Sequence, residues 1–236
     1  MLDYLAQLAR HGRIDPLEFY VSEAHRAVYV ENAKVACTAI KAAMFPAQFA
    51  QSAGQDAFHE DLRAGAFHRL PANASDYFVF TFVRHPLARL QSCYRDKVRG
   101  EGAAGAASGE SRSILHRRFH RSIFAAWGGV DIRDDKLPFD RFAKAVSSIP
   151  DRISDRHFAS QIRMVEAVEN AADHFVGRME RLEDDWEQVR ARTGLPALVR
   201  ANRTRSGHDQ TAPDAATLRL ISRRYARDFA ALGYER

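Results

Sequence analysis

A lysine, a cysteine and a threonine follow an apolar segment near the start of the chain, in a spacing that suits anion binding. Lys34, Cys37 and Thr38 lie in the stretch VYVENAKVACTAIKAAM, residues 28–44. When a strand leads through a turn into a helix, the turn amides and the helix N-terminus point at a bound phosphate, and a lysine adds charge. The stretch has no glycine and no GKS/T of a Walker loop, so an ordinary strand–turn–helix fits the spacing equally well.

A second stretch, YFVFTFVRHPLARLQSCYRDKV at residues 77–98, combines arginines with a hydroxyl. Arg84 stands at the end of the most apolar segment, and ligands of open α/β sheets bind at the carboxyl ends of strands. Ser92 follows, with Arg89 one helical turn before it and Arg95 one turn after. A guanidinium and a hydroxyl together bind phosphate well. The alternative is an arginine that caps the strand and a buried helix serine.

Lysine is rare in this chain, because only five of the 35 basic residues are lysines. Where arginine is the usual choice, a lysine indicates a position that needs a compact ammonium. Two of the five, Lys34 and Lys41, fall in the first stretch. This bias favours the anion-binding interpretation of that stretch.

Hydrophobic patterning predicts strands that alternate with helices. The expected strands are residues 27–30, 77–83 and 174–176, and the second is apolar enough to be covered on both faces of a sheet. The expected helices are residues 38–44, 86–97, 140–146, 159–168, 182–193 and 213–232. This order predicts an α/β fold with a parallel sheet flanked by helices.

Composition narrows the class of protein. The 236 residues are 46% hydrophobic with a net charge of +5, which excludes a disordered or fibrous chain. No stretch is apolar enough for a membrane span, no signal peptide is evident, and no Cys/His spacing suits zinc. We therefore expect a single domain, residues 1–236, in a soluble cytoplasmic protein, without bound metal.

The small, polar residues at about 99–113 predict a flexible insertion. They include a G-x-G-x-x-G pattern, but a dinucleotide site requires this pattern to follow a strand, and here it does not.

Both stretches resemble the nucleotide-binding motifs of the carbohydrate sulfotransferases, which include chondroitin and dermatan O-sulfotransferases. Residues 34–41, KVACTAIK, resemble the family's 5′-phosphosulfate loop, and residues 80–97 resemble its 3′-phosphate strand and helix. Weaker similarities follow in the family's order: residues 155–161 with a central His157, residues 176–185, Asn202, and residues 225–234. Ala33 replaces the usual proline and His85 the usual Asp or Asn. The chain is identified as a soluble, bacterial-type member.

The resemblance implies a P-loop-NTPase-like sulfotransferase fold and a donor, 3′-phosphoadenosine 5′-phosphosulfate (PAPS). It implies that Arg84 and Ser92 hold the 3′-phosphate. It implies a 5′-phosphosulfate site formed by Lys34, Val35, Ala36, Cys37 and Thr38. The sulfuryl group would pass to a hydroxyl of an acceptor, most simply a carbohydrate, with Lys34 stabilising the leaving group.

The acceptor hydroxyl needs a base, and the candidates are His59, Glu60, His68 and His157, of which His68 and His157 are preferred. Arg203 and Arg205 either reach the nucleotide or face solvent. Two other functions compete with sulfuryl transfer. A kinase-like phosphotransferase would need the missing Walker loop, and a polyanion- or nucleic-acid-binding module fits poorly with acidic residues interleaved among the arginines. The sequence does not determine the oligomeric state.

Overall fold

A computed structural model describes residues 2–100, 118–134, 136–199 and 212–236 of the chain. Most of the predicted insertion, together with Asn202, Arg203 and Arg205, lies outside the described residues. The chain divides into two compact units. Unit 1 comprises Met1–Pro16, His85–Ser160 and Asn202–Arg236, and unit 2 comprises Leu17–Arg84 and Gln161–Ala201. The single domain stays a prediction.

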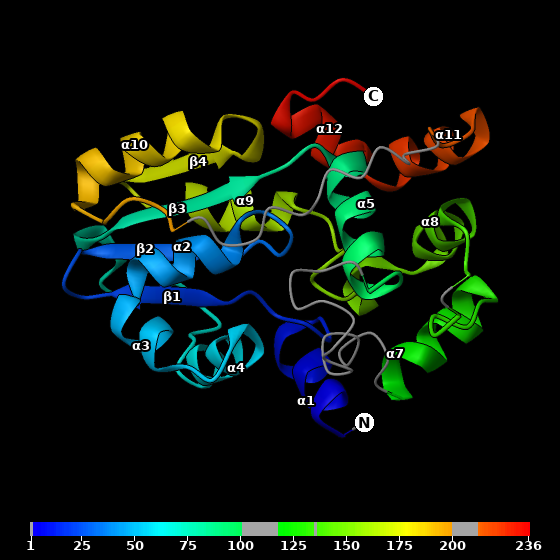
Figure 1. The fold of residues 1–236 in the computed structure, drawn as a ribbon, viewed down its shortest axis with the longest axis horizontal. Helices are drawn as coiled ribbons and strands as arrows, with labels where there is room; N and C mark the ends of the chain where they lie inside the picture. Colours follow the sequence, from blue (N-terminus) through cyan, green and yellow to red (C-terminus); the bar gives the residue numbers. More distant parts are fainter. Residues whose placement is uncertain (1, 101–117, 135, 200–211) are drawn as a thin grey trace. The chain divides into compact units, whose positions relative to one another are not determined.

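Unit 2 contains a four-stranded sheet with the order β1-β2-β3-β4 (Figure 1). Its strands are β1 (Phe19–Ser22), β2 (Ala27–Val30), β3 (Phe78–Val83) and β4 (His174–Arg178). The β2, β3 and β4 strands run parallel, as the sequence predicts. The β1 strand was not predicted and pairs antiparallel with β2, with Phe19 opposite Val30. Its four residues carry too weak a pattern by themselves, and pairing with β2 makes them a strand.

Helices cover both faces of this sheet, which explains why β2 and β3 are buried throughout. Tyr29, Phe80 and Phe82 pack with residues of α2 (Cys37–Met44) and α10 (Leu182–Thr193). On the other face, strand residues such as Val28 and Val79 pack with α9 (Ile162–Glu169). Gly177 in β4 is required by close packing, since a Cβ there would lie 2.4 Å from the ring of Phe82. The predicted α/β fold is confirmed.

The remaining helices complete the two units. Unit 2 also contains α3 (Pro46–Gln51), α4 (Gln55–Ala64), η1 (Ala74–Asp76) and η4 (Met179–Arg181). Unit 1 is helical where it is described, with its core among α5, α8, α11 and α12. Its elements are α1 (Leu2–His11), α5 (Pro86–Lys97), α7 (Arg118–Ile123), the π-helical η2 (Phe124–Gly128), α8 (Phe139–Ser148), η3 (Asp151–Ile153), α11 (Ala215–Arg224) and α12 (Ala226–Leu232).

Two helix predictions need correction. The helix expected from residue 159 begins at Ile162, because the Ala159 carbonyl and the Ser160 amide are bound to the side chains of Arg89 and Asp151. The helix expected over 213–232 is interrupted at Tyr225, whose backbone leaves helical geometry (φ −108°, ψ 26°). The buried Tyr225 hydroxyl donates to the Phe158 carbonyl, which fixes the break.

Candidate functional site

The turn that follows β2, residues 31–36 and hereafter the β2 turn, has an unusual backbone. Lys34 (φ 68°) and Ala36 (φ 52°) both adopt left-handed conformations, although neither is glycine. Such conformations cost about 1–3 kcal/mol each and cluster at functional sites. Left-handed residues before a helix turn successive amides toward one side, which creates a concavity for an anion. The α2 helix begins directly afterwards, at Cys37, with Ala36 as its N-cap.

A buried ion pair supports the β2 turn from beneath. Lys41, in α2, has a fully buried side chain whose Nζ lies 3.0 Å from Oε2 of Glu31 at the start of the turn. The same ammonium lies 4.7 Å from the ring centroid of Tyr20, whose hydroxyl donates to Glu18. Lys41 is therefore a structural lysine, while Lys34 is partly exposed on the turn.

The first helical turn of α2 contacts α4. The Oγ1 atom of Thr38 lies 3.0 Å from Nε2 of His59 in α4. The structure thus brings one of the four base candidates to a predicted donor-site residue. Cys37 is half-buried, and desolvation together with Glu31 raises the pKa of its thiol, so it stays protonated at neutral pH.

Arg84 meets the β2 turn at the carboxyl end of β3. Its Nη1 donates to the Lys34 carbonyl at 3.3 Å, so two residues that are 50 positions apart in sequence contact each other. The side chain of Gln161 holds the Arg84 backbone, because Oε1 accepts from the Arg84 amide (3.0 Å) and Nε2 donates to the Arg84 carbonyl (2.7 Å). The predicted phosphate-binding residues of unit 2 therefore gather at one edge of the sheet.

Asn32 links this arrangement to the β2 turn. Its Nδ2 donates to Oε1 of Gln161 and to the carbonyl of Phe82, both at 2.9 Å. Its Oδ1 is buried without a hydrogen-bond partner within the described part of the chain, a state that costs about 1–3 kcal/mol. Sequence reasoning assigned Asn32 no role; a polar residue directly after a buried strand is the signal that could have found it.

Ser92 and Arg89 lie on α5 in unit 1, and both are buried. The Arg89 guanidinium is bound to backbone carbonyls within unit 1. Its Nη1 donates to the Ala159 carbonyl (2.7 Å) and its Nη2 to the Arg156 carbonyl (2.5 Å). The desolvation that lowers the Arg89 pKa is offset in part by the nearby Tyr225 and Asp228. Arg89 is therefore a structural residue, and the role of Ser92 stays a prediction.

The two preferred histidines lie in different units. His68 follows Phe67, which pairs with Phe19, and the Nδ1 atom of His68 lies 2.9 Å from the Leu17 carbonyl. Because Phe19 lies opposite Val30 at the end of β2, this places His68 at the sheet edge that carries the β2 turn. His157 belongs to unit 1 and is buried, with its Nδ1 2.5 Å from Oδ1 of Asp155.

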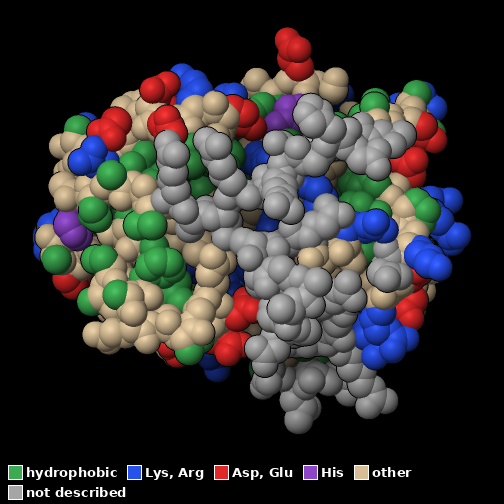
Figure 2. Space-filling model, viewed as in Figure 1, with side chains coloured by type: hydrophobic (Ala, Val, Ile, Leu, Met, Phe, Trp, Pro, Cys, Tyr) green, Lys and Arg blue, Asp and Glu red, His purple; other side chains and the backbone are tan. Residues whose placement is uncertain are grey.

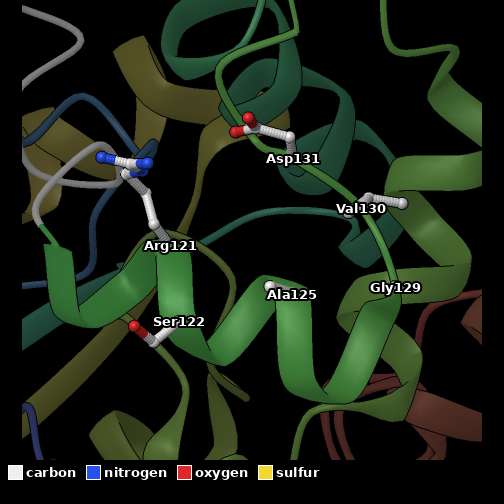
Figure 3. A pocket seen from close by; sticks show the side chains of 6 residues that line it. All are labelled: Arg121, Ser122, Ala125, Gly129, Val130 and Asp131. Atoms are coloured by element: carbon white, nitrogen blue, oxygen red, sulfur yellow. The ribbon is translucent and has the colours of Figure 1, made fainter.

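One cavity in unit 1 is lined by none of the predicted site residues. This cavity of 630 Å³ is lined by Arg121, Ser122, Ala125, Gly129, Val130 and Asp131 (Figure 3). Hydrogen bonds from Arg133 to Asp131 lower the pKa of this carboxyl. Basic and acidic side chains are interspersed on the face shown in Figure 2. Among the described residues, no group of three or more His, Cys, Asp or Glu side chains is arranged to hold a metal, and no helix there is long and apolar enough to cross a membrane.

A left-handed turn after one parallel strand, with an arginine at the end of the next, makes the chain an α/β protein with polar groups at the sheet edge where ligands of open α/β sheets bind. Residues 17–235 match the model of the Sulfotransferase family. The chain belongs to this family, and the resemblance noted in the sequence is confirmed.

The curated relatives are carbohydrate sulfotransferases. Carbohydrate sulfotransferase 14 of Homo sapiens is 30% identical over 149 residues, covering 62% of this chain and 36% of that protein. The Danio rerio protein of the same name is 30% identical over 125 residues, covering 52% and 32%. Carbohydrate sulfotransferase 8 of Homo sapiens is 25% identical over 236 residues, covering 92% and 51%. The chain thus spans about a third to a half of these relatives' length. No solved structure matches it significantly.

Proposed function

We propose that the chain is a PAPS-dependent O-sulfotransferase that moves a sulfuryl group to a hydroxyl of a carbohydrate. The observation that carries the proposal is the contact between Arg84 Nη1 and the Lys34 carbonyl. It joins the residues that the family resemblance assigns to the two anionic ends of the donor. Family membership supports sulfuryl transfer, and the names of the relatives support a carbohydrate acceptor.

The residues at the sheet edge fit a doubly anionic donor. The left-handed β2 turn and the N-terminus of α2 offer backbone amides to the 5′-phosphosulfate, with Lys34 as the neighbouring cation. In this proposal Val35, Ala36 and Cys37 contribute backbone, and Thr38 contributes its hydroxyl. Arg84 binds the 3′-phosphate, and Ser92 assists it according to the family pattern.

The catalytic contribution of these groups is positioning and charge stabilisation. The acceptor oxygen attacks sulfur in line with the bond to the leaving phosphate oxygen, and the hydroxyl proton passes to a base. Lys34 stabilises the negative charge that develops on that oxygen as the bond to sulfur breaks. Among the histidines, the contact with Thr38 supports His59 as the base; His68 and His157 are the alternatives.

Calorimetric titration with adenosine 3′,5′-bisphosphate tests the proposal. We expect binding at micromolar strength or better, in a range normal for enzyme ligands. Lys34→Ala should lower turnover by about 10²–10³-fold with little change in nucleotide affinity, whereas Arg84→Ala should mainly weaken binding. A folded wild-type protein that does not bind this nucleotide contradicts the proposal, and wild-type activity in both variants contradicts the site assignment.

A further inference from the structure

We propose that Gln161 is a positioning residue that orients Arg84 and thereby sets the preference of the site for a nucleotide with a 3′-phosphate. The inference rests on the proposed function, in which Arg84 binds that phosphate. It assigns to the residue preceding α9 a role in ligand recognition.

The first step of the argument is the two-point contact with one residue. The primary amide of Gln161 pairs with both the N–H and the C=O of Arg84. Two parallel hydrogen bonds fix the rotation of the Arg84 backbone as well as its position. The direction of the Arg84 side chain depends on that rotation, and its guanidinium reaches the Lys34 carbonyl.

The second step is the link to the β2 turn. Oε1 of Gln161 also accepts from Asn32, and Asn32 donates to Phe82 two residues before Arg84. The end of β3 and the start of the turn are therefore joined through one amide. Asn32 and Gln161 are both completely buried, so solvent cannot replace these hydrogen bonds when one partner is lost.

The third step is the chemistry of the side chain. Only a primary amide has a donor and an acceptor side by side on a stem of this length; a carboxylate cannot donate, and an apolar side chain can do neither. The backbone of Gln161 is itself anchored, because its carbonyl accepts from Met164 in the first turn of α9. Met164 packs in the core against the sheet. The amide thus reaches the strand ends from a rigid element.

The test compares adenosine 3′,5′-bisphosphate with adenosine 5′-monophosphate, which lacks the 3′-phosphate. For each protein, calorimetry gives the ratio of the two affinities. Thr81→Val is the matched control, because Thr81 is also completely buried and its hydroxyl donates to the Val30 carbonyl at 2.8 Å in the same sheet. Thermal unfolding of every variant separates a loss of stability from a loss of recognition.

Gln161→Leu should lower the affinity ratio at least about tenfold, whereas Thr81→Val should change it less than about twofold. In the Arg84→Ala background, Gln161→Leu should have no further effect on the ratio, because it acts through Arg84. Gln161→Glu keeps the shape of the side chain but cannot donate to the Arg84 carbonyl when ionised. If the leucine variant does not fold, Gln161→Glu should lower the affinity ratio in the same way.

The outcomes separate the two proposals. If the wild type binds the bisphosphate in preference and Gln161→Leu or Gln161→Glu keeps the wild-type ratio, the inference about Gln161 is wrong and the proposed function stands. If the folded wild type shows no preference for the bisphosphate, the proposed function fails and this inference fails with it.

Discussion

The β2 turn of unit 2 and residues 151–160 of unit 1, hereafter the 151–160 segment, are both rich in polar residues, but they use them differently. In the β2 turn and the first turn of α2, buried neighbours hold the backbone while Lys34 and Thr38 stay partly exposed. Asn32 and the Glu31–Lys41 pair supply that support. The side chains of Lys34 and Thr38, which the family pattern assigns to the ligand, are not the ones that support the turn from beneath.

In the 151–160 segment, the titratable side chains themselves form the ion pairs and hydrogen bonds that hold the structure together. Burial alone would raise the pKa of Asp155, but His157 and His120 outweigh it and hold that pKa well below the usual range. Asp151 contacts Arg13 and Arg224 and accepts from the Ser160 amide at 2.8 Å. Arg89 of α5 donates to two carbonyls of the same segment.

The difference shows how a polar cluster that supports the fold can be distinguished from one that binds a ligand. A cluster whose charges are buried and paired with each other acts as scaffold, since separating them costs several kcal/mol. A turn that keeps a partly exposed cation such as Lys34, while buried groups hold its backbone from beneath, is suited to a ligand. On this basis we propose the β2 turn as the site, whereas the 151–160 segment supports unit 1.

Two matched substitutions test this contrast directly. Glutamine can replace the donor function of histidine but cannot accept a proton at neutral pH. We expect His59→Gln to lower the turnover number about 10²–10⁴-fold with unchanged nucleotide affinity, the loss typical for a missing general base. His157→Gln should keep turnover within about twofold and lose about 3–5 kcal/mol of stability, because it removes the imidazole that contacts the buried Asp155.

Steady-state kinetics, calorimetry and urea unfolding give the three readouts. The reverse result, in which His157→Gln abolishes turnover and His59→Gln does not, would place the base in the 151–160 segment and overturn the contrast. His68→Gln, measured in parallel, covers the third histidine.

The support beneath the β2 turn is tested by Lys41→Met. This change leaves the buried Glu31 carboxylate without its 3.0 Å partner, and we expect a loss of about 3–5 kcal/mol in the free energy of unfolding. Adding Glu31→Gln should recover much of that loss, because the buried negative charge that the Lys41 ammonium balanced is then removed as well. Urea denaturation measures both variants. A loss below about 1 kcal/mol for Lys41→Met would mean that the pair contributes little to the turn.

The smallest expected effect concerns acid stability of the 151–160 segment. Burial alone would raise the pKa of Asp151, but the Ser160 amide and the Arg224 and Arg13 guanidiniums outweigh it and lower the pKa to about 2. A depressed carboxyl pKa stabilises the fold above the unfolded value near 4, and the contribution is lost as pH falls from about 4 to 2. Allowing for the partial exposure of Asp151, we expect this contribution to the free energy of unfolding to be about 1–2 kcal/mol.

The measurement is the stability difference between wild type and Asp151→Asn from pH 5 to pH 2. The difference should shrink across this window. A difference that is constant with pH would show that Asp151 acts by its hydrogen-bonding shape alone.

Part of the fold and of the site could be predicted from sequence because the signals are local. Nearly continuous apolar runs identified β2 and β3, and the positions of Lys34 and Arg84 follow from where those runs end. Pro86 at the first turn marked the start of α5. The family resemblance rested on these same two stretches, and the family match confirms it.

The sequence by itself therefore determined the three parallel strands, the family and the residues that stand at the strand ends. Only the tertiary structure decided which polar groups meet. Arg84 and Gln161 are 77 positions apart, and nothing in the local pattern of either pairs them. The left-handed Lys34 and Ala36 arise in a stretch without glycine, where local preference opposes them. The physical reason is that the spacing of apolar residues in the sequence indicates only which residues are buried. The hydrogen-bond partner of a buried polar group often lies on a segment far away in sequence, and the two meet only when the chain folds.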